Sequence, residues 1–472
     1  MASLSIMYRR SLWGWFLLAL LAALAVGYIR YLRPMLRVAT GYTAKTVCSE
    51  HFVAGFPVEQ VMADLPDNPL VPYLRVQVDP DTAQVRASLW GWLEPQRAIY
   101  RPNLGCTLLA GPGPHALGGL ELPAAPAPDP QALWPQGEAT PIQNTAAGSD
   151  IPELAAALER AFAEPDPARP KRTRAVVVIH QGQLVGERYA PGITPQTPLL
   201  GWSMTKSVTS ALVGIYLAQK GLSPNEPAPA PEWYARPDDP RQAITWEHLL
   251  RMTSGLDFRE DYGDLHADVL QMLYNTADMG AYMAARPLKA PPGTWWNYTG
   301  GSTNLLARLI RLDFGPDLAG YWAFPHQTLF GPLGMTTAVL EPDASGSWVG
   351  SSYMYASARD WARFGLLYLQ DGMWEGRRIL PEGWVAFSLQ ATAAARGEYG
   401  AHWWLNQGLA EGEGRRWPDL PPDAFAALGH DGQVVLVVPS RQAVIVRLGL
   451  SRYDTWNLND FARDILAALP AR

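Results

Sequence analysis

Hydrophobic residues follow three different spacings along this chain, and each spacing predicts a different kind of element. Leu12–Ile29 is an uninterrupted apolar run of about 18 residues, long enough for a helix to cross a bilayer. Apolar and polar residues alternate in Leu74–Asp79 and again in Val85–Trp90, which predicts a hairpin with its turn at Pro80. Between Ile151 and Ala163 the apolar residues recur at helical spacing, which predicts an amphipathic helix.

Apolar segments typical of buried strands occur near both ends of the second part of the chain. Arg174–His180 is followed by Leu184–Tyr189, and Val434–Val438 is followed by Ala443–Leu448, so each pair predicts a hairpin. A C-terminal helix is expected over Asp460–Leu469. Strands at both ends with helices between them predict an α+β fold, in which helices flank an antiparallel sheet and a further region is all-helical.

The same patterns divide the chain into four parts. Residues 1–40 are expected to form an N-terminal transmembrane anchor or signal-anchor, and residues 41–110 a small strand-rich module. Residues 111–149 have the composition of a Pro/Gly/Ala-rich linker, and residues 150–472 form the main domain.

Basic residues flank the apolar run on both sides, so the positive-inside rule does not fix its orientation. Ala23-Leu24-Ala25 would suit cleavage of a signal peptide. We favour an uncleaved anchor, because Tyr28 and Tyr31 at the end of the run form an interfacial aromatic pattern.

Composition narrows the class of protein. With 48% hydrophobic and 17% charged residues the chain is globular, and a net charge of −6 argues against nucleic acid as a partner. The two cysteines, Cys48 and Cys106, are either two buried free thiols or a disulfide. In a chain with an export-type N-terminus we favour the disulfide, which places the main domain outside the cytoplasm, in a bacterial periplasm beside the inner membrane.

The candidate chemistry begins at Ser203. Lys206 is the one lysine that follows a serine by three positions, and residues three apart share a helical face. Unpaired N–H groups at a helix N-terminus suit a site where an oxyanion forms. Alternatively, Ser203 is a helix cap and Lys206 a solvated side chain, although the surrounding segment is apolar.

Two further segments carry polar groups that suit the same chemistry. Tyr298 lies on a glycine-flanked loop before a predicted helix and would complete a proton relay, unless it is simply a packed aromatic residue. His430 and Gly432 precede the apolar strand, and the N–H of Gln433 would donate to an oxyanion. His430 would otherwise be a surface histidine. The other histidines show no metal-binding spacing, so no metal is expected.

Taken in order, Ser203-Met204-Thr205-Lys206, Tyr298 and His430-Asp431-Gly432 resemble the motifs of the serine β-lactamase/DD-peptidase/esterase superfamily, class C type. Leu249–Leu256 resembles the segment between its first two motifs. Trp202, and Pro292-Gly293-Thr294 ahead of Tyr298, are similar to the 6-aminohexanoate-dimer hydrolase branch.

Two departures from the family pattern stand out. Gly300 replaces the asparagine of Tyr-x-Asn, and His430 replaces the lysine of Lys-Thr-Gly. A lysine in that position binds a substrate carboxylate better than a histidine does. Both departures favour an amidase or esterase over a β-lactamase.

The resemblance implies a β-lactamase/transpeptidase-like fold and a serine hydrolase that cleaves a small amide, ester or peptide through an acyl-enzyme, without metal or organic cofactor. Ser203 would be the nucleophile, and Lys206 and Tyr298 would share the proton transfers in an order that the sequence does not decide. Ser203 and Gln433 N–H groups would form the oxyanion hole, near His430 and Gly432. The alternatives are a penicillin-binding DD-peptidase or β-lactamase, and a non-catalytic membrane-tethered binding protein.

Overall fold

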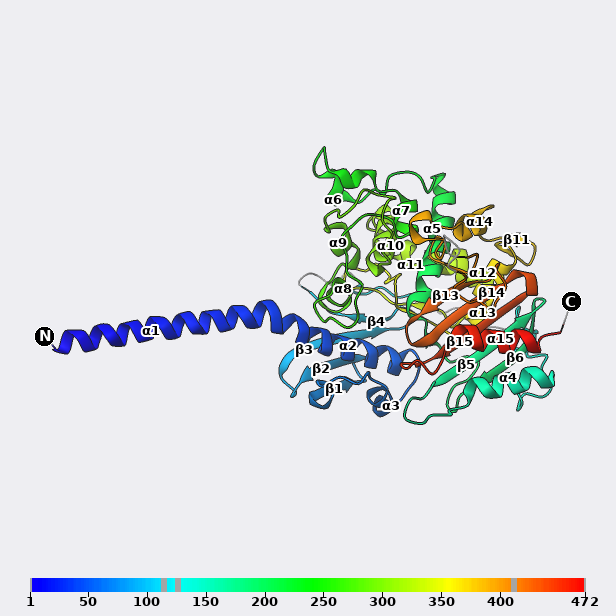
Figure 1. Cartoon of the computed structure of the whole chain (residues 1–472), viewed down its shortest axis with the longest axis horizontal. Helices are drawn as coiled ribbons and strands as arrows, with labels where there is room; N and C mark the ends of the chain where they lie inside the picture. The colour runs from blue at the N-terminus through cyan, green and yellow to red at the C-terminus, as the bar shows by residue number, and fades with distance from the viewer. Residues whose placement is uncertain (1, 112–116, 124–128, 409–413, 471–472) are drawn as a thin grey trace.

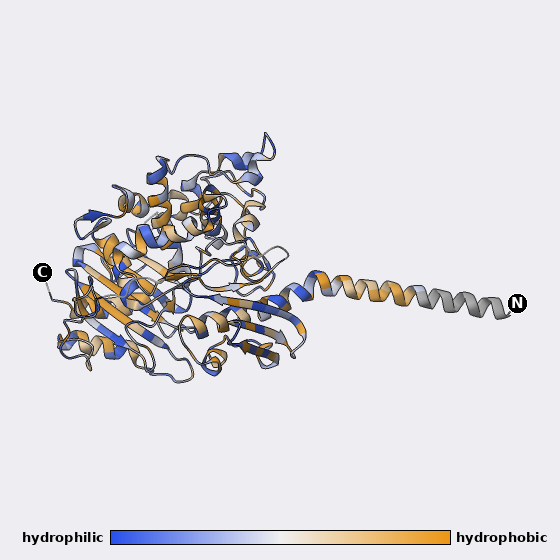
Figure 2. Ribbon diagram, turned by 180° about the vertical axis from the view of Figure 1, so that it is seen from behind, coloured by the Kyte–Doolittle hydropathy of each residue, from blue (hydrophilic) through white to orange (hydrophobic). Residues whose placement is uncertain are grey.

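The computed structural model describes residues 2–111, 117–123, 129–408 and 414–470, with side chains from residue 15 onward. One long helix begins the chain: α1 (Ala2–Gly27) continues through a π-helical turn, η1 (Tyr28–Leu32), into α2 (Arg33–Phe52). Figure 1 shows α1 projecting from the body of the protein, and in Figure 2 its described residues are mostly hydrophobic. Among the described helices, this is the one long and apolar enough to span a membrane or to be a signal sequence.

An N-terminal sheet packs against α2. It contains the strands β1 (Leu74–Asp79), β2 (Gln84–Leu89), β3 (Leu93–Arg101) and β4 (Gly105–Leu108), which are antiparallel and lie in that order. The short helix α3 (Val58–Ala63) precedes them. The predicted hairpin is confirmed as β1 and β2. The predicted strand-rich module starts at residue 41, but its first strand begins only at Leu74. Residues 41–52 instead continue helix α2, which packs its buried side on the sheet.

A disulfide joins Cys48 on α2 to Cys106 on β4, as predicted. The two cysteines are 58 residues apart in the sequence and both are fully buried. The bond therefore clips the end of the long N-terminal helix to the last strand of the N-terminal sheet.

The main sheet has six antiparallel strands that come from distant parts of the sequence. Both predicted hairpins are confirmed, and they lie side by side in the sheet because the last strand, β15, pairs with β5 from near the start of the main domain. In spatial order the strands are β12 (Trp404–Leu405), β13 (Phe425–Gly429), β14 (Gln433–Val438), β15 (Ala443–Gly449), β5 (Thr173–His180) and β6 (Gln183–Tyr189).

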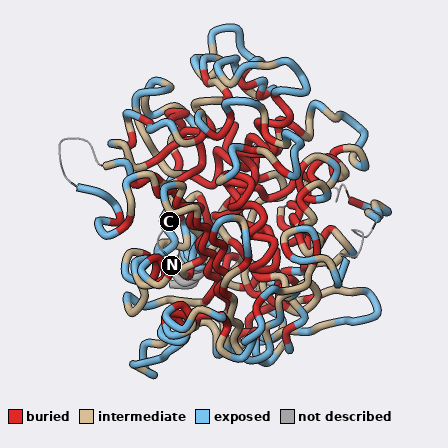
Figure 3. The backbone as a smooth tube through the Cα atoms, turned by 90° about the vertical axis from the view of Figure 1, so that its right-hand side faces the viewer, coloured by how far each residue is buried: buried red, intermediate tan, exposed pale blue. Residues whose placement is uncertain are grey.

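Both faces of this sheet are buried, which explains why its strands read as continuous apolar runs. Side chains alternate along a strand, so Val176 and Val178 pack under α4 (Pro152–Phe162) and α15 (Leu458–Ala468). Val177 and Ile179 face the other way, into the core shared with α5 (Thr205–Lys220) and α13 (Ala358–Leu369). Figure 3 shows this buried interior as a continuous red region.

A helical region covers the side of α5 that faces away from the main sheet (Figure 1). Its central helix, α10, packs against α5, α7 and α9. The elements of this region and the small sheets beside it are α6 (Pro231–Tyr234), α7 (Trp246–Leu250), α8 (Asp268–Asn275), α9 (Met279–Ala284), α10 (Gly300–Phe314), α11 (Leu318–Pro325), α12 (Gly331–Leu333), α14 (Trp384–Leu389), β7 (Leu199–Leu200), β8 (Val339–Leu340), β9 (Met354–Ala356), β10 (Met373–Trp374) and β11 (Arg377–Arg378).

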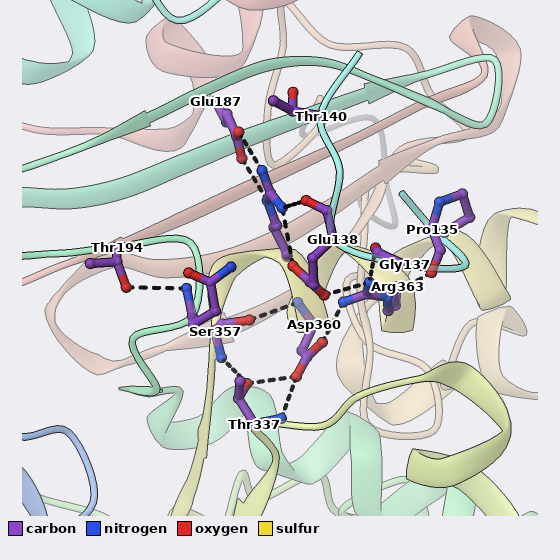
Figure 4. Close-up of polar contacts among 12 residues, drawn as sticks. Pro135, Gly137, Glu138, Thr140, Glu187, Thr194, Thr337, Ser357, Asp360 and Arg363 are labelled. Carbon is purple, nitrogen blue, oxygen red and sulfur yellow. Dashed lines mark hydrogen bonds and ion pairs between the residues drawn. The ribbon is translucent and has the colours of Figure 1, made fainter. Parts of the chain in front are cut away.

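Part of the expected linker is packed on the main domain. Residues 112–116 and 124–128 lie outside the described residues, whereas Trp134 is buried and Glu138 forms ion pairs with two arginines of α13. Arg363 donates to the carbonyl oxygens of Pro135 at 3.0 Å and Gly137 at 2.8 Å (Figure 4). The described residues 129–149 are therefore held against the main domain by the arginines of α13.

A buried ion pair joins the N-terminal helix to the main domain. Lys45 of α2 contacts Glu341, whose carboxylate also accepts hydrogen bonds from the Ser49 hydroxyl at 2.8 Å and the Cys106 N–H at 2.7 Å. Neither charged side chain is appreciably exposed. The N-terminal residues and the main domain thus share polar contacts as well as a hydrophobic core.

Candidate active site

Ser203 lies on a sharp turn between β7 and α5. The turn is a short 3₁₀ helix, η3 (Trp202–Met204), which leads directly into α5. Trp202 has a positive φ of 47°, a conformation that is costly for a bulky residue, and its carbonyl accepts a hydrogen bond from the Thr205 hydroxyl. Ser203 remains partly exposed while the residues after it are buried. The turn therefore presents the serine hydroxyl at the start of a buried helix.

Lys206 is buried one turn along the same helix. Its Nζ donates to the Ser203 Oγ at 3.0 Å and to the Ser351 carbonyl oxygen at 2.9 Å. The Nζ also lies 4.9 Å from the centre of the Tyr298 ring. The alternative of a solvated lysine is thus wrong, and the structure brings together the three side chains that the sequence singled out.

Tyr298 stands on an anchored loop before α10. The preceding residue, Asn297, donates its backbone N–H to the Met252 carbonyl and its side-chain amide to the Phe258 carbonyl, both at 2.8 Å. The Tyr298 ring packs 5.4 Å from Trp404, measured between ring centres. Carbonyl groups in and just after Leu249–Leu256, together with the aromatic cluster, therefore fix the position of the Tyr298 ring beside Lys206.

Glu260 is a site residue that the sequence analysis missed. Its Oε2 accepts the Gly300 N–H at 2.7 Å, and its Oε1 accepts the Tyr262 hydroxyl at 3.0 Å. Burial raises the pKa of the Glu260 carboxyl above its ordinary value, and the charge of Lys206 opposes that rise.

Gly300 provides the one sequence signal that points to this carboxylate. A Cβ built on Gly300 would lie 3.5 Å from the Glu260 Oε1 and 3.3 Å from the Ser351 Cβ. A larger residue here, such as the family's asparagine, would thus extend toward space that Glu260 and Ser351 already occupy.

His402 is buried on the other side of Lys206. One of its ring nitrogens shares a hydrogen bond of 2.7 Å with the Thr303 hydroxyl, and its carbonyl accepts the Ser207 hydroxyl at 2.6 Å. Burial and the charge of Lys206 lower the pKa of His402 to about 3. The imidazole is therefore neutral near neutral pH.

The predicted third motif forms the turn between β13 and β14. His430 is half exposed, with its ring stacked 5.7 Å from Tyr262 and edge-on to Trp202 at 5.8 Å. Gly432 has a φ of 81°, and a Cβ there would meet the Arg447 guanidinium at 2.5 Å. Of this motif, His430 lies beside the residue that precedes Ser203, and Gly432 shapes the turn.

The Gln433 side chain serves the sheet. Its amide donates to the Gly449 carbonyl at 2.6 Å and accepts the Gly449 N–H at 2.9 Å. The end of β13 approaches the nucleophile turn closely, since a Cβ on Gly429 would lie only 2.2 Å from the Gly201 carbonyl oxygen. The assignment of the Gln433 N–H to an oxyanion hole stays a prediction.

Within the described residues, no group of three or more histidine, cysteine, aspartate or glutamate side chains is arranged to hold a metal ion. The Ser203 hydroxyl accepts a hydrogen bond from Lys206, whose amine also contacts the Ser351 carbonyl and lies beside the Tyr298 ring. This set suits proton transfer to and from a serine hydroxyl.

Comparisons with known proteins give the family of the main domain and its similar folds. The family model described as Beta-lactamase matches residues 158–469. The 6-aminohexanoate-dimer hydrolase of Paenarthrobacter ureafaciens is 24% identical over 309 residues, which cover 58% of this chain and 72% of that protein.

Two solved structures are similar in fold. A Bacillus anthracis protein named as a proposed 6-aminohexanoate-dimer hydrolase has a TM-score of 0.55 and 22% identity, over 74% of this chain and 89% of that one. A family VIII carboxylesterase has a TM-score of 0.51 and 17% identity, over 68% of this chain and 98% of that one.

Proposed function

Because this chain belongs to the beta-lactamase family, we propose that it is a serine hydrolase that cleaves an amide or ester bond through an acyl-enzyme intermediate. The observation that supports this most directly is the 3.0 Å hydrogen bond from the Lys206 Nζ to the Ser203 Oγ, at a helix N-terminus and beside Tyr298. The names of the similar proteins, a dimer hydrolase and a carboxylesterase, agree with this class of reaction.

In the first half-reaction the Ser203 Oγ attacks the substrate carbonyl carbon. The hydroxyl proton passes to the Lys206–Tyr298 pair, which returns a proton to the leaving amine or alcohol as the C–N or C–O bond breaks. In the second half-reaction water attacks the acyl carbon and gives a proton to the same pair, which passes a proton to the Ser203 oxygen as its bond to the acyl group breaks and the acid leaves. Ser351 holds the lysine amine in place through both steps.

Developing charge on the carbonyl oxygen needs N–H donors. The Ser203 N–H at the start of α5 is one proposed donor, and the Gln433 N–H is the other. Each donor of this kind contributes about 3 kcal/mol of transition-state stabilisation.

The site favours an amide or ester over a β-lactam. His430 takes the place where the family has a lysine, and its Nε2 lies 3.3 Å from the Asp431 carboxylate. Glu260 places a carboxylate at Gly300. Both features weaken binding of a substrate carboxylate, which penicillins and cell-wall peptides carry.

Hydrolysis of p-nitrophenyl acetate by the full-length protein in phospholipid nanodiscs tests this proposal. We expect turnover that Ser203→Ala abolishes, whereas Ser440→Ala, on an exposed hairpin, keeps the wild-type rate. Nitrocefin in the same assay separates an esterase or amidase from a β-lactamase. Turnover that survives Ser203→Ala would place the nucleophile elsewhere.

We also propose that the N-terminal helix anchors the protein in a membrane and that the main domain lies outside the cytoplasm. The long exposed apolar helix and the Cys48–Cys106 disulfide support this placement. Protease added to spheroplasts should remove the main domain while the α1 segment stays with the membrane. Protection of the main domain from protease would contradict it.

A further inference from the structure

An apolar cavity of about 260 Å³ lies between α2 and the candidate active site. Val38, Ala39 and Tyr42 of α2 form one wall, and the opposite wall carries Trp202 and His430 of the site described above, together with Tyr262. Much of the remaining lining is leucine: Leu65, Leu70, Leu74, Leu265 and Leu270.

Three polar side chains of this lining already have partners within the protein. The Thr43 hydroxyl donates to the Ala39 carbonyl at 2.8 Å, the Asn68 side chain accepts the Leu70 N–H at 2.9 Å, and the Tyr262 hydroxyl donates to Glu260. A polar ligand would find few groups to bind here. A hydrocarbon chain would be stabilised by removal of its surface from water.

The cavity adjoins the residue that precedes the proposed nucleophile. Trp202 directly precedes Ser203, and His430 packs between Trp202 and Tyr262. An ester or amide group carried by a chain in the cavity would therefore have to pass these rings to meet the Ser203 hydroxyl.

The α2 wall belongs to a part of the chain that lies before the family-matched residues 158–469. It is also close to the proposed membrane. Ile29 ends the apolar run, and Val38 follows nine residues later, roughly 13 Å along a continuous helix. The helix that would cross the bilayer therefore also forms one side of the cavity.

From this arrangement we infer that the substrate of the proposed hydrolase is an amphiphile, an ester or amide whose hydrocarbon chain occupies the cavity beneath α2. This inference rests on the proposed function, because it assigns a substrate class to the same serine. A bilayer is the source of such molecules, and the anchor holds the cavity near its surface. The hydrocarbon chain belongs either to the acyl group or to the leaving group of the substrate. In both cases the cavity would recognise a long apolar chain.

A chain-length series tests the inference on the full-length protein in phospholipid nanodiscs. One arm uses p-nitrophenyl esters from acetyl to octanoyl, and the other uses acetates of alcohols of the same lengths. In at least one arm kcat/KM should rise about fourfold per added methylene until the cavity is filled. A flat or falling series in both arms would overturn the inference.

Filling the cavity provides the matched variant. Ala39→Phe should remove most of the preference for octanoyl over acetyl ester, whereas Ala63→Phe, exposed at the end of α3, should keep it. The ratio of the two rates does not depend on the amount of folded enzyme. An unchanged ratio in Ala39→Phe would show that the chain binds elsewhere.

Photolabelling separates failure of this inference from failure of the proposed function. A dodecanoyl ester with a diazirine in its chain, applied to Ser203→Ala, should label peptides that contain Val38–Thr43 or Leu65–Leu74. Ala39→Phe should lose this label while α1 stays labelled by membrane contact. Cavity labelling without any ester turnover in wild type would contradict the proposed function alone, and absence of cavity labelling would contradict the inference.

Discussion

Removal of Lys45 should weaken the whole fold, because it leaves the Glu341 carboxylate charged and buried. The Lys45 and Glu341 side chains are 4% and 0% exposed, so water cannot replace the lost ammonium group. Breaking a pair of this kind by removing one partner costs about 3–5 kcal/mol. We therefore expect Lys45→Met to lower the free energy of unfolding by about that amount.

The remaining contacts of Glu341 explain why the loss is not smaller. Ser49 and Cys106 still donate to its carboxylate, at 2.8 Å and 2.7 Å, but neither carries a charge. A second substitution, Glu341→Gln, keeps an acceptor oxygen for both donors and removes the stranded charge. The double variant should therefore regain about 1–3 kcal/mol relative to Lys45→Met alone.

Urea unfolding of the full-length protein, followed by tryptophan fluorescence, measures these differences. Lys220→Met is the matched control: its Nζ lies 2.6 Å from the Asp313 carboxylate, but both side chains are at least 40% exposed. Such a surface pair contributes about 0–1 kcal/mol. Equal losses for Lys45→Met and Lys220→Met, or a double variant less stable than Lys45→Met, would refute the reasoning.

Three further predictions follow from single features. Gly429→Ala would place a Cβ 2.2 Å from the Gly201 carbonyl oxygen and therefore shift the turn that carries Ser203. The kcat for p-nitrophenyl acetate should then fall roughly a hundredfold. An unchanged kcat would show that the turn tolerates the shift. His402 has a pKa of about 3 when folded and about 6.5 when unfolded, so the unfolded state alone binds its proton between those values. Stability should therefore fall by up to about 1.4 kcal/mol per pH unit as the pH decreases below about 6.5, and urea unfolding of His402→Asn should lack this part of the slope. Cys48→Ser combined with Cys106→Ser opens a loop that spans 58 positions, so the free energy of unfolding should fall by about 4 kcal/mol in the same assay. An unchanged urea midpoint would show that the disulfide adds no stability.

Local patterns were enough to predict the two hairpins of the main sheet and the proximity of Ser203 to Lys206, whereas Tyr298 was singled out by the order of the motifs. The strands are buried on both faces, so residues such as Val176 and Val435 appear in unbroken apolar runs that only a covered sheet explains. Ser203 and Lys206 share one helical turn, so their proximity is a property of the helix itself.

The remaining features depend on contacts between distant residues. Glu260 reaches Gly300 across 40 positions, from a polar segment with no distinguishing pattern. The Gln433 amide is held by Gly449, which only the sheet register brings near. The cavity beneath α2 likewise arises because a helix from residues before the family-matched domain packs beside Trp202, and hydrophobic periodicity does not reveal that neighbour.

The central claim is that the Ser203 oxygen becomes acylated. The most direct measurement is treatment of the folded full-length protein with a fluorophosphonate probe, followed by digestion and mass spectrometry of the labelled peptide. We expect one adduct, on Ser203, that forms much more slowly in Lys206→Ala. An adduct on another residue, or none on a protein that hydrolyses esters, would contradict the account.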